Sequence, residues 1–103
     1  MDQQATFCRD DGPDACRLVV TGEIDLGVAG TFAAAIGDLL ASGPAAAVID
    51  LRGVSFFNST GIGVLCDAAD RARRNGVALA VAPSDHVRRT LEITGLTDTF
   101  ELC

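Results

Sequence analysis

The sequence has no tryptophan, tyrosine or lysine, and its aromatic side chains are five phenylalanines. Base stacking would fall to phenylalanines that mostly lie in apolar runs, which argues against binding of single-stranded nucleic acid. Acidic residues outnumber basic ones by 14 to 8, and the net charge of −6 repels DNA, RNA and anionic lipid headgroups. No apolar run approaches the ~20 residues of a membrane span, and the first residues lack the basic and apolar stretches of a secretory signal. We therefore expect a cytoplasmic protein with no nucleic-acid or membrane partner.

The four cysteines, at positions 8, 16, 66 and 103, are too scattered to suggest a metal site. No CxxC spacing occurs, and the single histidine, His86, lies far from all four in the sequence. Zinc needs clustered ligands, and a reducing cytosol keeps thiols free. We expect four free thiols, with Cys16 and Cys66 in the core and Cys103 exposed, and neither a metal nor a cofactor.

The length of 103 residues fits one domain, spanning residues 1–103. Short strand-like runs alternate with longer helical patterns along it. Strands are expected at residues 5–9, 16–21, 46–51, 77–81 and 97–102, and helices at 28–40, at 59–75 and between Ser84 and Gly95. A hairpin followed by strand–helix–strand units predicts an α/β fold with a mixed, mostly parallel sheet of four to five strands and three or more helices.

The boundaries of these elements follow from turn and capping residues. Gly22 is expected to end the second strand, Asp25 to cap the first helix, and residues 52–57 to form a loop. Two acid-then-base pairs at i,i+4 are expected on the outer face of the 59–75 helix: Asp67–Arg71 and Asp70–Arg74.

The most informative stretch leads from the third strand into the second helix. Asn58, Ser59 and Thr60 can each cap that helix. On a purely structural interpretation, Ser59 is the cap, while Gly61 and Gly63 let the helix approach the sheet. On a functional interpretation, a hydroxyl at a helix N-terminus lies at the carboxyl edge of a parallel sheet, where α/β proteins place their sites. The helix dipole and free backbone N–H groups there favour an anion such as a phosphate.

Four segments of the chain carry a resemblance to a known family. They are residues 18–25 (LVVTGEID), residues 48–51 (VIDL) followed by 54–56 (VSF), residues 58–65 (NSTGIGVL), and the set Pro83, Val87, Leu91, Gly95, Leu96 and Phe100. Together they resemble the STAS domain, the sulfate-transporter and anti-sigma-factor-antagonist domain. The similarity extends over roughly residues 15–102 and is greatest to the stand-alone bacterial anti-sigma factor antagonists.

This resemblance implies a regulatory role. In the family, the unphosphorylated antagonist binds an anti-sigma factor that is also a serine kinase, and binding frees a sigma factor. The kinase then phosphorylates the first hydroxyl of the signature, which corresponds to Ser59, and a phosphatase reverses the modification. The resemblance implies a partner surface made of Asn58, Ser59, Thr60, Gly61, Ile62 and Gly63.

Two features depart from the family pattern. The family commonly has aspartate before the acceptor, whereas Asn58 can neither carry a negative charge nor accept a proton. The family often has another C-terminal helix, and without one we expect the sheet edge and one face to be less covered. Two other roles fit the same resemblance, an accessory subunit of a transporter ATPase and a scaffold protein. Enzyme activity is not expected, because Glu23 and Asp25 have no histidine or nucleophile beside them in a motif.

Overall fold

Five strands form a single sheet in the order β1-β2-β3-β4-β5 in the computed structural model, which describes residues 5–103. The strands are β1 (Ala5–Arg9), β2 (Cys16–Ile24), β3 (Ala46–Phe57), β4 (Ala78–Pro83) and β5 (Glu101–Leu102). β1 pairs antiparallel with β2, and every later pair is parallel. The predicted α/β fold with a mixed, mostly parallel sheet is therefore confirmed.

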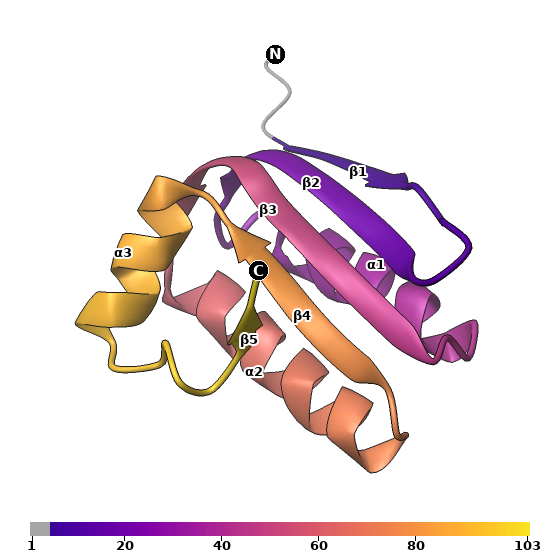
Figure 1. Cartoon of the computed structure of the whole chain (residues 1–103). Helices are drawn as coiled ribbons and strands as arrows, with labels where there is room; N and C mark the ends of the chain where they lie inside the picture. The colour runs from indigo at the N-terminus through magenta and orange to yellow at the C-terminus, as the bar shows by residue number, and fades with distance from the viewer. Residues whose placement is uncertain (1–4) are drawn as a thin grey trace.

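Three helices follow the parallel strands: α1 (Ala29–Ala41), α2 (Ser59–Arg74) and α3 (Asp85–Ile93). Figure 1 shows α1 and α2 on one face of the sheet and α3 beside the end of β3. In the described part of the chain, no helix covers the opposite face. Because β2, β3 and β4 run in the same direction, the segments that enter the three helices all leave from one edge of the sheet. This carboxyl edge contains the predicted site.

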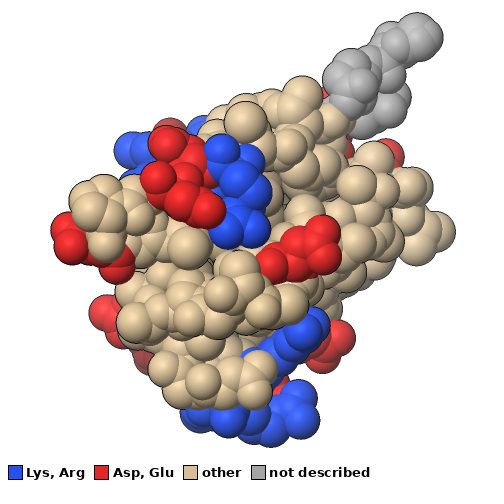
Figure 2. All heavy atoms as spheres, turned by 90° about the vertical axis from the view of Figure 1, so that its right-hand side faces the viewer, with Lys and Arg blue, Asp and Glu red and all other residues tan. Residues whose placement is uncertain are grey.

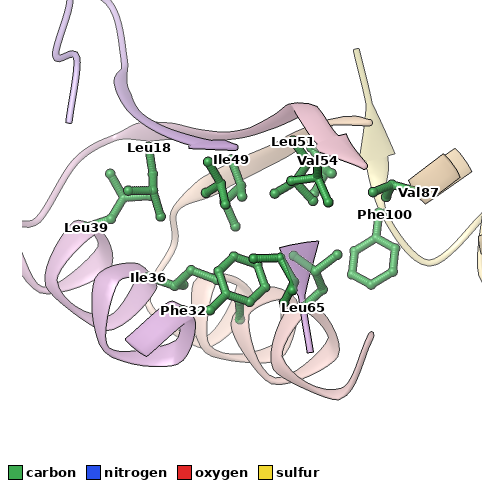
Figure 3. Packing of buried hydrophobic residues seen from close by; sticks show 14 of the residues in the cluster. Leu18, Phe32, Ile36, Leu39, Ile49, Leu51, Val54, Leu65, Val87 and Phe100 are labelled. Atoms are coloured by element: carbon green, nitrogen blue, oxygen red, sulfur yellow. The ribbon is translucent and has the colours of Figure 1, made fainter. Parts of the chain in front are cut away.

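The hydrophobic core lies between the sheet and the helices α1 and α2 (Figure 3). It contains large side chains that are at most 2% exposed, among them Leu18, Ile49, Leu51, Phe32 and Leu65. Burial of each such side chain stabilises the fold by roughly 1.5–3 kcal/mol. The rings of Phe32 and Phe57 meet edge to face with centroids 6.1 Å apart. Cys16 and Cys66, which were predicted in the core, are half-buried and pack against it.

Three strands continue beyond their predicted ends: β2, β3 and, by two residues, β4, which ends at Pro83. The prediction that Gly22 ends β2 was wrong, because the strand runs on to Ile24. Gly22 has a φ of 97°, which glycine adopts without steric cost, and the pairing with β3 shifts its register just after it. The extended β2 gives residues 52–57 backbone partners up to Phe57, so these residues form the end of β3 and the loop prediction was also wrong. The irregularity bends the ladder without ending it.

The segments at the ends of the first helix and the last strand also differ from prediction. Asp25 does not cap α1. Its carboxylate accepts a hydrogen bond from the Gly27 N–H at 3.0 Å and closes a turn, while the N-cap residue is Val28. The last strand was expected over residues 97–102, but only β5 pairs with β4. α3 begins where it was predicted to, after Ser84, whose hydroxyl caps the helix by accepting the Val87 N–H at 3.2 Å.

The ion pairs found on α2 share one acidic residue, Asp70. Asp70 bonds to Arg74 at 2.9 Å, as predicted, and also to Arg73 at 3.2 Å. The other predicted pair, Asp67 with Arg71, does not form within residues 5–103. Figure 2 shows basic side chains grouped at the end of the molecule where α2 ends, with acidic atoms between them. This cluster is therefore partly neutralised.

Asp50 is the one buried charged side chain in the described chain, and two arginines hold it. Arg52 donates two side-chain hydrogen bonds, at 3.0 and 2.8 Å, and its backbone N–H donates a third at 3.1 Å. Arg17 donates another at 2.7 Å. These hydrogen bonds lower the pKa of Asp50 to about 2 despite its burial, and those from the Arg52 side chain have the largest effect. Asp50 thereby links β2 to β3 on the face without helices.

The Asp50→Asn variant tests this ionic link. We expect its free energy of unfolding at neutral pH to be about 1–2 kcal/mol below wild type, since the charge-assisted bonds are lost but Arg52 is mostly exposed. The pKa of Asp50 is depressed on folding, so its stabilisation is complete above about pH 4 and is lost as the pH falls towards 2. The difference between the two proteins should shrink over that window in urea denaturation.

The control for this measurement is Asp38→Asn on α1, which removes an exposed carboxylate that forms no ion pair in the described part of the chain. Its unfolding free energy should stay within about 0.5 kcal/mol of wild type. An Asp50→Asn deficit of equal size at pH 7 and at pH 2 would contradict the ionic origin of the link.

Candidate functional site

The carboxyl ends of β2 and β3 lie level with each other. Ile24 and Phe57 are the last paired residues of the two strands. Residues 25–28 leave β2 for α1, and Asn58 leaves β3 for α2. The start of α2 therefore lies at the same sheet edge as the β2–α1 turn, which is the edge where α/β proteins bind ligands and partners.

Asn58 is the N-cap of α2. Its backbone is extended, with φ −110° and ψ −172°, and its side-chain oxygen accepts the N–H groups of Thr60 at 3.1 Å and Gly61 at 3.3 Å. Of the three candidate caps, the structure therefore selects Asn58, and the interpretation of Ser59 as the cap was wrong. An amide or carboxylate reaches two residues ahead, whereas Ser59 is already the first helical residue.

The residues predicted to contact a partner, Asn58 to Gly63, differ in how exposed they are to solvent. Asn58 and Thr60 are half-buried, Gly61 and Ile62 are buried, and Ser59 and Gly63 are exposed. Among the described residues, the Ser59 hydroxyl has no hydrogen-bond partner. The segment thus presents mainly Ser59 and Gly63 to solvent, one turn apart on α2, while Ile62 anchors the segment in the core.

The two glycines of the segment have different structural roles. A Cβ atom on Gly61 would lie 2.8 Å from the Phe57 ring, so only glycine lets α2 pass this close to the end of β3. A Cβ on Gly63 would meet no atom within 4 Å. The prediction that both glycines bring the helix close to the sheet therefore holds for Gly61 and is wrong for Gly63.

Sequence reasoning missed two exposed apolar side chains at the same edge. Phe56 is 42% exposed and packs on the His86 ring, with centroids 5.7 Å apart and planes 33° apart. Leu26, in the turn after β2, is 76% exposed. Residues 52–57 gave no simple alternation for Phe56, because Val54 and Phe57 are both buried and lie three residues apart. The exposure of Phe56 follows the register shift after Gly22, where Glu23 pairs with Phe56. Leu26 offered only a weak signal, a large apolar residue between Asp25 and Gly27.

The chemistry available at this edge is that of an exposed hydroxyl. No acid or histidine bonds to Ser59 in the described chain, so the site contains a potential nucleophile without its own base. Residues 5–103 contain no group of three or more metal-ligating side chains. Nor is any helix among those residues both long and apolar enough to cross a bilayer. The exposed Ser59 hydroxyl at the first residue of α2 suits modification or docking of the start of this helix.

Comparison with known sequences identifies relatives of the chain. Residues 10–103 match the STAS domain. The anti-sigma-F factor antagonist RsfB of Mycobacterium tuberculosis, from strains CDC 1551 / Oshkosh and ATCC 25618 / H37Rv, is 36% identical over 85 residues. The aligned region covers 82% of this chain and 70% of RsfB.

Solved structures share the fold. The crystal structure of an anti-sigma factor antagonist from Mycobacterium paratuberculosis matches with a TM-score of 0.83 and 32% identity, over 96% of this chain and 85% of that one. SpoIIAA in its unphosphorylated form matches with a TM-score of 0.76 over 95% and 88% of the two chains, and at 17% identity this likeness concerns the fold alone. The family match over residues 10–103 and the identity to RsfB agree, and the chain belongs to the STAS domain family.

Proposed function

We propose that this chain is an anti-sigma factor antagonist that binds an anti-sigma factor with serine kinase activity, frees a sigma factor, and is switched off by phosphorylation of Ser59. The 36% identity to RsfB, an anti-sigma-F factor antagonist, supports the first part. The observation that carries the second part is the exposed Ser59 hydroxyl at the first residue of α2, to which no residue of the described chain bonds. A phosphatase reverses the modification in this scheme, and all the partners are cytoplasmic.

The modification needs a partner that brings most of the chemistry. The Ser59 oxygen attacks the γ-phosphorus of ATP, the bond from that phosphorus to the bridging oxygen breaks, and ADP leaves. The hydroxyl proton must pass to a base, and the Asn58 amide cannot accept it. The kinase therefore supplies the base together with ATP and its metal ion, as positioned groups do in phosphoryl transfer. This chain contributes the nucleophile and the rigid helix end that presents it.

A phosphate on Ser59 would change the surface more than the fold. It adds about −1.5 to −2 charges at neutral pH. The positive end of the α2 dipole favours that charge, so the helix should remain folded. The Thr60 and Gly61 N–H groups already donate to the Asn58 side chain, so they are not free to bind the phosphate. The phosphate would therefore project into solvent from the start of α2, where a partner can contact it.

The surface around Ser59 indicates the chemistry of that partner. Leu26 and Phe56 expose apolar side chains at the same edge of the sheet. Glu23, which pairs with Phe56 in the β2–β3 ladder, is also exposed there. Apolar side chains near the centre of an interface contribute most when they are fully desolvated. We propose that the anti-sigma factor covers Leu26 and Phe56 with apolar side chains and leaves no room for a phosphate at Ser59.

The Ser59→Ala variant should bind the anti-sigma factor and accept no phosphate. Its unfolding free energy should stay within about 0.5 kcal/mol of wild type, because Asn58 and not Ser59 caps α2. Intact-mass analysis after incubation with the kinase and ATP measures the modification, and calorimetric titration measures binding. Thr60→Ala is the control and should still gain one phosphate. Phosphate mapped to Thr60 in the wild-type protein would refute the assignment.

Two substitutions of Asn58 separate its capping role from its charge. Asn58→Ala should lower the free energy of unfolding by about 1 kcal/mol, because two helix N–H groups lose their acceptor. Asn58→Asp keeps the cap and adds a carboxylate oxygen that can orient the Ser59 hydroxyl, so it should raise the rate of phosphorylation. Urea denaturation and radiolabel incorporation measure the two effects. Equal rates for Asn58→Asp and wild type would show that the charge has no part in the transfer.

Leu26→Ala tests the apolar part of the docking surface. The side chain is exposed in the free protein, so stability should not change, while affinity for the anti-sigma factor should fall about tenfold as buried apolar area is lost. Ile93→Ala is the matched control, because Ile93 is 78% exposed and lies at the far end of α3 from the Phe56–His86 contact. If both variants lose affinity equally, the docking surface is wrongly placed.

A further inference from the structure

The face of the sheet opposite α1 and α2 is hollowed over the amino ends of β3 and β4. Figure 1 shows β2, β3 and β4 crossing this face with no helix in front of them. A shallow hollow of about 530 Å³ lies over β3 and β4, and its lining consists of Ala46, Ala47, Val48, Ala78, Leu79, Ala80 and Glu101. Small side chains on adjacent parallel strands thus leave an apolar depression open to solvent.

One row of side chains crosses this face with opposite charges at its two ends. The strand register pairs Arg17 with Val48, Val48 with Ala80, and Ala80 with Glu101. Paired residues of parallel strands project from the same face, and Val48 and Ala80 both line the hollow. With strands about 4.8 Å apart, the row spans roughly 14 Å. It places a cation at β2, apolar side chains in the middle, and an anion at β5.

The same face carries little net charge among the described residues. Alternation along the strands assigns to it two basic and three acidic residues, namely Arg17, Arg52, Glu23, Asp50 and Glu101. Asp50 is already bonded to both arginines. The whole chain carries −6, so most other surfaces of two copies would repel each other. The open sheet face, with one excess negative charge against −6 for the chain, is a surface on which two copies can meet with little of that repulsion.

We propose that a second copy of this chain packs on the open sheet face, related by a two-fold axis that runs parallel to the strands between β3 and β4. This axis places β2 over β5 of the partner subunit, so Arg17 faces Glu101 of the partner subunit, twice by symmetry. It also places Val48 over Ala80 of the partner subunit, so that each valine enters the hollow of the other copy. Charge and size are both complementary in this arrangement.

The charges select this arrangement over the alternative two-fold. The alternative two-fold axis runs perpendicular to the strands, along the row from Arg17 to Glu101. It would place Arg17 opposite Arg17 of the partner subunit and Glu101 opposite Glu101 of the partner subunit. Like charges that face each other across an interface oppose that pairing. We expect a weak association, with the dimer forming at micromolar to millimolar concentrations. This proposal involves neither Ser59 nor the anti-sigma factor.

Sedimentation velocity of the full chain over that concentration range tests the proposal. We expect a concentration-dependent shift from monomer to dimer that weakens as salt is added. Glu101→Arg should weaken dimerisation at least about tenfold, since it puts like charges at both ends of the row. Ala80→Arg, which fills the hollow, should leave only monomer.

Glu92→Arg is the matched control, because it makes the same charge change at an exposed position of α3 and should leave dimerisation unchanged. Circular dichroism confirms that each variant is folded before comparison. A wild-type chain that stays monomeric throughout overturns the proposal and leaves the open face to an occupant other than a second copy. Equal effects of Glu101→Arg and Glu92→Arg would overturn the charge pairing on which the arrangement depends.

Discussion

The parallel pairing of β3 with β2 on one side and β4 on the other is the constraint on which the rest of the structure depends. β3 runs for twelve residues through the centre of the sheet, and it contributes core side chains to one face and Asp50 to the other. Its last residue, Phe57, pairs with the last residue of β2 and contacts Gly61 of α2. The end of β3 therefore fixes where α2 begins, and with it the position of Ser59.

The sequence was sufficient to predict the helices and strands that have a regular apolar pattern. It was insufficient to predict a strand that forms only because a distant strand pairs with it. The 3.6-residue period of apolar side chains located α1 and α2, and the short apolar runs located β3 and β4 at their starts. Residues 52–57 contain arginine, glycine and serine, which locally favour a loop. They are a strand because β2 extends past Gly22 and offers them backbone partners, which is a relation between distant segments and leaves no local signal.

The difference between local patterns and long-range pairing also explains which residues at the candidate site were predicted and which were missed. The signature at residues 58–65 located Ser59 because its pattern is local, and the choice among three capping residues then depended on which side chain met the helix N–H groups. Leu26 and Phe56 are apolar residues whose exposure is decided by the β2–β3 register. Sequence alone places such residues in a core, since burial is the usual state of leucine and phenylalanine.

Asn58 gives the site a charge balance that an aspartate would not. Its amide oxygen satisfies the Thr60 and Gly61 N–H groups as well as a carboxylate would, so the helix end keeps its geometry. It adds no charge beside Ser59, so a phosphate there would meet the helix dipole without repulsion from its neighbour. The unmodified site in turn lacks a group that accepts the hydroxyl proton. In the proposed scheme, an amide in place of a carboxylate favours the phosphorylated state once it has formed and leaves the transfer itself to the proposed kinase. The lifetime of the modified form would, in the same scheme, depend more on the proposed phosphatase than on the residues around Ser59.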